Sequence, residues 1–366
     1  MKQNILIWCF LLIGFSVFSQ EENTKTFTID ANYFYGNILL HSKDIAHLIT
    51  EHPEGFIVSY NKKTFGDLRW QQEYNYPDWG FSTFFQNSKN NTLGNNIGVY
   101  AHLNFYFIQR NLQLRVAQGV AYNSNPFDFE SNIKNNAYGS HILFSTYLLL
   151  NYSKENIYKN IGVQAGITFM HYSNGNVAAP NTSTNTLAFN IGVNYKFNDD
   201  SQNEFINDTT YTRIKEPIKF NAVIRGGINE SDYLNLGQQP FLVISAFVDK
   251  RLSYKSTVTA GVDVFFSKFL EKEIEYVAAS FPSFGVSGDE DYKRVGLFVG
   301  HDLHINRFSA LFHLGYYVYY PYDFEGRFYQ RIGLKYFITD NIFGVISLKT
   351  HAAKAEAVEF SVGYRF

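Results

Sequence analysis

The sequence predicts an all-β protein: a transmembrane, antiparallel outer-membrane β-barrel of about 14 to 16 strands, with 12 possible. Three observations predict this class. The chain begins with the pattern of a secretion signal. Beyond it no apolar run approaches the roughly 18 residues that a membrane helix needs, although 18% of the residues are aromatic. Many segments of about ten residues instead alternate apolar with polar side chains, as membrane-spanning β-strands do.

Residues 1–19 are expected to be a signal peptide. They have a basic start at Lys2, an apolar run from Ile5 to Val17 and a small residue, Ser19, at the expected cleavage point. The one cysteine, Cys9, lies within that run, so the mature chain has no disulfide, thiolate metal site or cysteine nucleophile. The formal net charge of −2 does not indicate a basic surface that would bind nucleic acid. Because we find no repeat or linker that divides the remainder, residues 20–366 are predicted to form a single barrel domain.

The C-terminal segment shows the strand pattern most clearly. Apolar side chains at 358, 360, 362, 364 and 366 share one face, and polar or small ones share the other. Its aromatic end, Phe366, resembles the terminal strand that barrel-assembly machinery recognises, so this machinery is an expected partner. Similar runs lie near residues 97–109, 112–122, 139–152, 158–173, 187–197, 217–226, 240–251, 258–266, 292–304, 307–320, 326–338 and 341–350. A closed barrel is favoured because an open sheet would leave unpaired backbone groups in lipid.

The connections alternate between short turns and long polar loops. The short set is 109–111, 252–254, 304–306 and 339–340, and the long set is 123–138, 174–185, 227–239, 269–291, 320–326 and 351–356. Outer-membrane barrels place short turns in the periplasm and long loops outside. The linker 198–212 falls on the short-turn side and is longer than this scheme predicts. Residues 42–52 read as a short helix that starts near Ser42 and is ended by Pro53.

The segment FMHYSNGN, residues 169–176, carries the candidate chemistry. In the strand before it, the odd-numbered residues from Ile161 to Phe169 are apolar and are predicted to face lipid. Continuing this parity places His171 and Ser173 on the lipid face, near the outer end of an outward-running strand. Extrapolation from Leu187 places Asn185 on the same face of the next strand, beside His171. Polar side chains on this face are costly unless partnered, which favours a functional role.

Serine activated by a histidine that a third group orients is the arrangement for acyl transfer. Residues two apart lie on one strand face roughly 6.5–7 Å apart at their Cα atoms, so Ser173 and His171 can meet with suitable rotamers. Backbone N–H groups of the turn at Asn174 and Gly175, or the side chain of Asn181, are candidates for an oxyanion hole. The alternative is an interfacial His and Ser that merely end a strand before an Asn-Gly turn.

One stretch of the chain resembles a known family. His171-Tyr-Ser-Asn-Gly175, then Pro180-Asn181 and a strand ending GVNYKF at 192–197, resembles the outer-membrane lipid A 3-O-deacylase family, which is acyloxyacyl hydrolase-like. The resemblance covers residues 157–197. It implies a β-barrel serine esterase in the outer membrane of a Gram-negative-type bacterium, acting on lipid A or lipopolysaccharide without metal or organic cofactor. Ser173 would be the nucleophile, His171 the general base, and Asn174 and Asn181 the oxyanion partners.

The chain departs from this family pattern in two ways. The family's acid, a glutamate that orients the histidine, falls on Asn185, which can orient an imidazole but cannot stabilise an imidazolium by charge. Compact members have about eight strands, whereas this chain suggests nearly twice as many. These departures keep an alternative open: a non-enzymatic barrel, either a porin-like channel or an inactive deacylase relative that binds lipopolysaccharide. Phospholipid as the substrate is not separable from lipid A by sequence.

Overall fold

The computed structural model describes residues 26–197, 204–208, 210, 214, 216–352 and 354–366. The predicted signal peptide, residues 1–19, lies outside the described residues. Sixteen antiparallel strands are found in the described part of the chain. They are β1 Phe27–Ile38, β2 Glu54–Lys62, β3 Asp78–Asn87, β4 Asn95–Phe107, β5 Leu112–Asn123, β6 Ile142–Tyr158, β7 Ile161–Ser173, β8 Thr184–Phe197, β9 Lys219–Asn229, β10 Gln239–Arg251, β11 Ser256–Ser267, β12 Lys293–Ile305, β13 Phe308–Tyr319, β14 Phe328–Phe337, β15 Ile342–His351 and β16 Lys354–Arg365.

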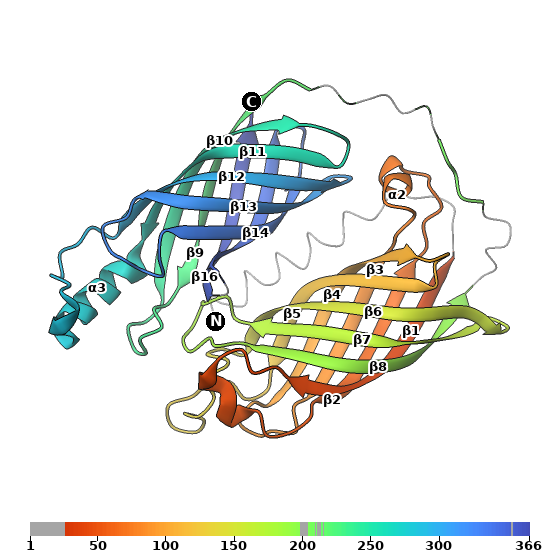
Figure 1. Cartoon of the computed structure of the whole chain (residues 1–366), viewed down its shortest axis with the longest axis horizontal. Helices are drawn as coiled ribbons and strands as arrows, with labels where there is room; N and C mark the ends of the chain where they lie inside the picture. The colour runs from red at the N-terminus through yellow and green to blue at the C-terminus, as the bar shows by residue number, and fades with distance from the viewer. Residues whose placement is uncertain (1–25, 198–203, 209, 211–213, 215, 353) are drawn as a thin grey trace.

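The strands close into two barrels, not one (Figure 1). Strands β1 to β8 form the first barrel, in which β1 pairs with β8 from Phe27 opposite Phe197 to Ile38 opposite Thr186. Strands β9 to β16 form the second, closed by pairing between β16 and β9. The class and the strand count were predicted correctly, but the single barrel was wrong. The over-long linker 198–212 is not a turn within a barrel, since it lies between β8 and β9.

Alternation of side chains fails to reveal this division for a physical reason. A period of two tells which face of a strand is apolar, but it carries no information about which strand is its hydrogen-bonded neighbour. Eight strands are the smallest common closed number, and they enclose an interior just wide enough for side chains. The chain therefore repeats the compact eight-stranded unit instead of enlarging it.

Most of the long connections of both barrels lie at the same end, which we call the long-loop end and which faces left in Figure 1; the connection between β2 and β3 is the long exception at the opposite end. At the first barrel's long-loop end, the 3₁₀ helix η2 Lys43–Leu48 begins after Ser42, whose hydroxyl accepts a hydrogen bond from Asp44 N at 3.2 Å. The short helix predicted over 42–52 is confirmed. Helix α3 Lys268–Ser280 and the 3₁₀ turn η3 Pro282–Phe284 lie in a loop of the second barrel, where no helix was predicted. In the described residues, no helix is long and apolar enough to cross a membrane.

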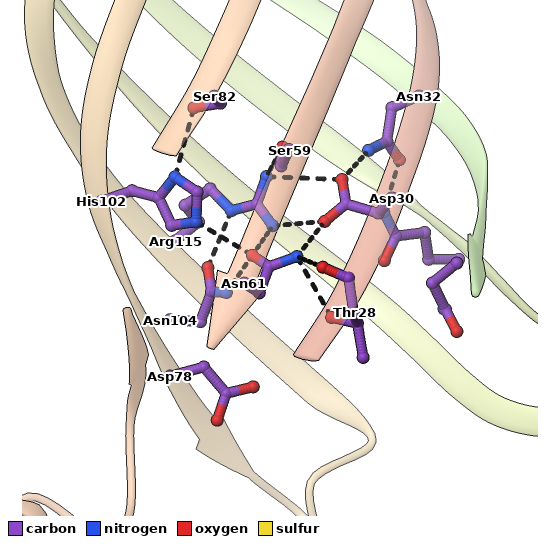
Figure 2. Close-up of polar contacts among 12 residues, drawn as sticks. Thr28, Asp30, Asn32, Ser59, Asn61, Asp78, Ser82, His102, Asn104 and Arg115 are labelled. Carbon is purple, nitrogen blue, oxygen red and sulfur yellow. Dashed lines mark hydrogen bonds and ion pairs between the residues drawn. The ribbon is translucent and has the colours of Figure 1, made fainter. Parts of the chain in front are cut away.

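The first barrel is filled by a polar network (Figure 2). The fully buried guanidinium of Arg115, on β5, donates to Asp30 Oδ2 on β1 at 2.7 Å and to Asn104 Oδ1 on β4 at 2.7 Å. It also donates to Asn61 Oδ1 on β2 at 2.9 Å, an oxygen that His102 contacts through Nε2 at 2.9 Å. Side chains from four strands are thus joined across the lumen, which satisfies groups that would be costly to bury alone.

The second barrel has its own charged interior. Arg331 bridges two carboxylates, with Nη1 at 2.8 Å from Asp263 Oδ2 and Nε at 2.6 Å from Glu359 Oε2, and all three side chains are fully buried. Nearer the long-loop end, Arg294 Nη2 lies 2.6 Å from Glu356 Oε1. These ion pairs join opposite walls of the barrel, as Arg115 does in the first. Each barrel therefore has a separate, filled interior.

Filled interiors predict that the protein does not conduct ions. We expect planar bilayers holding the purified full-length protein to show no steady conductance, because interlocked side chains occupy both lumens. A refolded porin of known conductance, measured in the same bilayers, is the positive control. A large and steady wild-type pore would contradict a filled lumen and would favour the channel alternative.

The two barrels contact each other directly. At their short-turn ends, helix α2 Arg69–Glu73 of the first barrel meets turns of the second. The hydroxyl of Tyr74 donates to the carbonyl of His304 at 2.7 Å, and Lys255 Nζ lies 3.6 Å from Glu73 Oε2. The guanidinium of Arg69 stacks over the ring of Tyr254 at 4.4 Å. The barrels therefore stand side by side with equivalent ends adjacent (Figure 1).

Candidate active site

Strand β7 has the facing that its sequence predicts. The odd-numbered residues from Ile161 to Ile167 are exposed on the outside of the first barrel, whereas the even-numbered residues from Gly162 to Thr168 are covered or partly covered. His171 continues the outward parity and is half-buried. Ser173 follows on the same parity, yet only 6% of its surface is exposed, because the turn after β7 folds back over it. Both residues lie at the long-loop end of the strand.

His171 and Asn185 are direct neighbours across the β7–β8 hairpin. They occupy paired positions in the two strands, and His171 Nδ1 lies 2.7 Å from Asn185 Oδ1. Since an amide oxygen only accepts, this contact places the imidazole proton on Nδ1 and leaves the Nε2 lone pair available as a base. The predicted proximity of these two residues is therefore observed.

The hydroxyl of Ser173 is surrounded by hydrogen-bonding groups from the turn. It donates to Asn181 Oδ1 at 3.1 Å and accepts from Asn181 Nδ2 at 3.0 Å and from Gly175 N at 3.0 Å. Two N–H donors therefore converge on the serine oxygen. Within the described residues no hydrogen bond joins Ser173 to His171 in this conformation. The hydroxyl must therefore leave its contacts with the turn before it can donate to the imidazole.

Asn174 and Asn181 brace the turn that follows β7. The backbone N–H of Asn174 donates to Asn181 Oδ1 at 2.9 Å, and the Asn174 side chain donates to Ala178 O at 2.6 Å. The same side chain accepts from Asn176 N at 2.9 Å. Both polar groups of Asn174 are thus used inside the turn, so Gly175 N–H and Asn181 Nδ2 are better placed to meet an oxyanion than the Asn174 side chain is.

The second barrel contributes residues to this turn that were not predicted from the sequence. The loop between β9 and β10 touches the turn after β7 through Glu230 and Gln238, and Val358 of β16 packs against Gly175. No local signal points to these residues, because they lie more than 50 positions away in the chain. In the described part of the chain there is no group of three or more His, Cys, Asp or Glu side chains that could hold a metal ion.

Comparisons with known proteins bear on both barrels. A family model described as lipid A 3-O-deacylase matches residues 54–194, and one described as acyloxyacyl hydrolase, C-terminal domain, matches residues 218–366. Together they cover most of the chain and divide it where the barrels divide. No curated protein matches the chain.

Solved structures similar to the chain include two mutants of the porin from Rhodopseudomonas blastica. One has 8% identity and a TM-score of 0.21, and covers 93% of this chain and 99% of its own. The other has 9% identity and a TM-score of 0.20, with the same coverage of both chains. The two-barrel architecture is defined by the strand pairing within the chain itself.

Proposed function

Since the chain belongs to the lipid A 3-O-deacylase family, we propose that Ser173, His171 and Asn185 form the esterase site with which it removes an acyl chain from lipid A. The observation that carries this assignment is the geometry at the end of β7. A histidine oriented through Nδ1 at 2.7 Å stands two residues from a serine whose oxygen meets two N–H donors at 3.0 Å. They supply a base, a nucleophile and, beside the nucleophile, two N–H donors that we assign to the oxyanion once the serine oxygen has attacked.

The reaction proceeds in two steps. In the first, Ser173 Oγ attacks the ester carbonyl while His171 Nε2 takes its proton, and the oxyanion that forms accepts from Gly175 N–H and Asn181 Nδ2. The carbon–oxygen bond to the sugar then breaks, and the imidazolium returns its proton to the departing sugar hydroxyl. In the second step a water, deprotonated by His171, attacks the acyl-serine; the carbon–oxygen bond to Ser173 breaks, the imidazolium returns its proton to Ser173 Oγ, and the fatty acid is released. No oxidant, reductant or further reactant is required.

The position of the site suits a substrate that diffuses within a membrane. The outside of β7 and β8 carries exposed apolar residues such as Ile167, Phe189 and Ile191 directly below His171. We infer that this surface lies in the outer membrane and that the long-loop end faces outward. An acyl chain in the outer leaflet can then approach the site along the barrel wall. Insertion into that membrane would need the barrel-assembly machinery.

A direct assay tests the function. Purified full-length protein is incubated with lipid A in detergent micelles, and the reaction is followed by mass spectrometry. We expect a 3-hydroxy fatty acid to appear together with lipid A that has lost one acyl chain. Phospholipid in matched micelles tests the alternative substrate. If neither lipid released a fatty acid, the proposed hydrolysis would be refuted.

Asn185 tests the role of the third residue. Replacing Asn185 with alanine removes the acceptor that orients His171 while the base itself stays, so we expect kcat to fall roughly 10- to 100-fold, less than the whole value of a general base. Replacing it with aspartate supplies a charge beside the imidazolium and should raise kcat above wild type. Initial rates of fatty-acid release give both values. Equal rates in all three proteins would show that Asn185 does not orient the base.

A further inference from the structure

We propose that the second barrel helps to build the esterase site, and that Glu230 is a positioning residue that holds the catalytic turn in place. This inference rests on the proposed function. Glu230 follows β9 at the long-loop end of the second barrel, and it contacts the segment Asn174–Asn181, which we call the catalytic turn. It touches neither substrate nor reacting atoms, so it acts through that segment alone.

Hydrogen bonds between the barrels converge on this turn. The carboxylate of Glu230 accepts from Ala179 N at 3.0 Å through Oε2 and from Gly237 N at 3.2 Å through Oε1. Its backbone N–H donates to Asn176 O at 3.0 Å, and its carbonyl accepts from Asn176 Nδ2 at 2.8 Å. Gln238 adds a bond from Nε2 to Val177 O at 2.9 Å. Glu230 thus makes three of these four hydrogen bonds between the second barrel and the turn, and its bond to Gly237 ties the turn to the β9–β10 loop.

An apolar contact supports the same arrangement. Gly175 has a left-handed backbone, with φ of 66°, and a Cβ at this position would meet Val358 Cγ2 at 2.3 Å. Val358 lies on the outward parity of β16, where Phe360 and Val362 are exposed, yet it is only 4% exposed. The wall of the second barrel therefore covers the glycine whose N–H reaches the nucleophile.

Small displacements of this turn would matter for catalysis. Gly175 N–H and Asn181 Nδ2 both reach Ser173 Oγ at 3.0 Å, and both belong to the segment that Glu230 and Gln238 hold. A misplacement of about 1 Å in a catalytic group can cost on the order of 100-fold in rate. Binding of the lipid, which we expect along the barrel wall, does not depend on these loops. Loosening the turn should therefore affect kcat and leave KM nearly unchanged.

Substitutions in the full-length protein test this inference. Glu230→Ala removes both carboxylate contacts, and we expect roughly tenfold lower kcat with KM within about twofold of wild type. Labelling of Ser173 by a fluorophosphonate should slow by a similar factor. Asn176→Gly tests the same contact from the side of the first barrel. Glycine readily adopts the left-handed backbone of this position, φ 64°, and the variant loses the side-chain hydrogen bond to Glu230 O. It should lower kcat in the same way.

Asp232→Ala is the matched control. Asp232 is an acidic residue in the same loop, but it pairs with Lys354 of its own barrel, and both side chains are exposed. It should keep wild-type kcat. Wild-type kcat and labelling in Glu230→Ala, with Ser173→Ala inactive, would overturn the inference and leave the proposed function standing. An equal loss in Asp232→Ala would also overturn it. Fatty-acid release by Ser173→Ala would defeat both. Heat-modifiable mobility in gel electrophoresis shows whether each variant barrel is folded. If Glu230→Ala is not folded, the kcat of Asn176→Gly tests the inference in its place.

Discussion

Replacing Ser173 with alanine is expected to lower fatty-acid release from lipid A by at least about 10³-fold, since removal of a nucleophile leaves only binding and oxyanion stabilisation. The change deletes one oxygen and its hydrogen bonds to Asn181 and Gly175. It should leave the barrel intact, because Ser173 is the last residue of β7. Mass spectra of lipid A from cells that express wild type, Ser173→Ala or no protein give the measurement.

Ser140→Ala provides a matched control for this experiment. Ser140 is a partly exposed serine of the same barrel, and its hydroxyl donates to the carbonyl of Ile142 at 2.9 Å. Lipid A from cells with this variant should match wild type. The nucleophile assignment would be refuted by one pattern in particular: identical lipid A from wild-type and Ser173→Ala cells that differs from lipid A of cells without the protein.

The contact between His171 and Asn185 could be predicted because strand facing is local. A period of two fixes which side chains share a face, and a hairpin brings its two strands together, so residues flanking the turn at matched parity become neighbours. The 2.7 Å contact follows from that logic. By spacing, Asn185 is predicted to stand at the position of the family's acid, and its amide oxygen lies 2.7 Å from His171 Nδ1. Whether this amide suffices for catalysis is a matter for the Asn185 variants.

The number of barrels and the role of Glu230 could not be predicted in this way. Barrel closure depends on pairing between β1 and β8, which begin more than 150 residues apart. The alternation of apolar and polar side chains along a strand does not indicate which distant strand it pairs with. The single available signal was the long polar linker between Phe197 and Lys219. The burial of Val358 has the same origin: its parity predicts an outward position, and only the approach of Gly175 from the other barrel covers it.

Replacing Arg331 with methionine is expected to destabilise the second barrel by about 3–5 kcal/mol, because it leaves two buried carboxylates without their cation. Asp263 and Glu359 lie 2.8 and 2.6 Å from Arg331, and all three are fully buried. Neighbouring hydroxyls on Ser245 and Ser347 still donate to these carboxylates but bring no charge. Folding of Arg331→Met should therefore require protonation of a carboxylate or entry of water, and its denaturant midpoint should fall.

Two spectroscopic probes can locate that loss. Of the three tryptophans, Trp8 lies in the predicted signal peptide, so a protein made without residues 1–19 keeps only Trp70 and Trp79, both in the first barrel. Arg331→Met should lower the midpoint of part of the far-ultraviolet circular dichroism transition and leave the tryptophan fluorescence transition in place.

Arg327→Met is the matched control for Arg331→Met. Arg327 is an exposed arginine in the loop just before β14, and its replacement should change neither transition.

Equal shifts of both probes in Arg331→Met would mean that the contacts between the barrels make them unfold as one unit. In that case the second barrel would support the catalytic turn through stability as well as through Glu230. An unchanged circular dichroism midpoint would contradict the role given to the buried charges, because Arg331 pairs directly with both Asp263 and Glu359, whereas the nearby buried Arg225 donates to Ser245 and Ser361 instead.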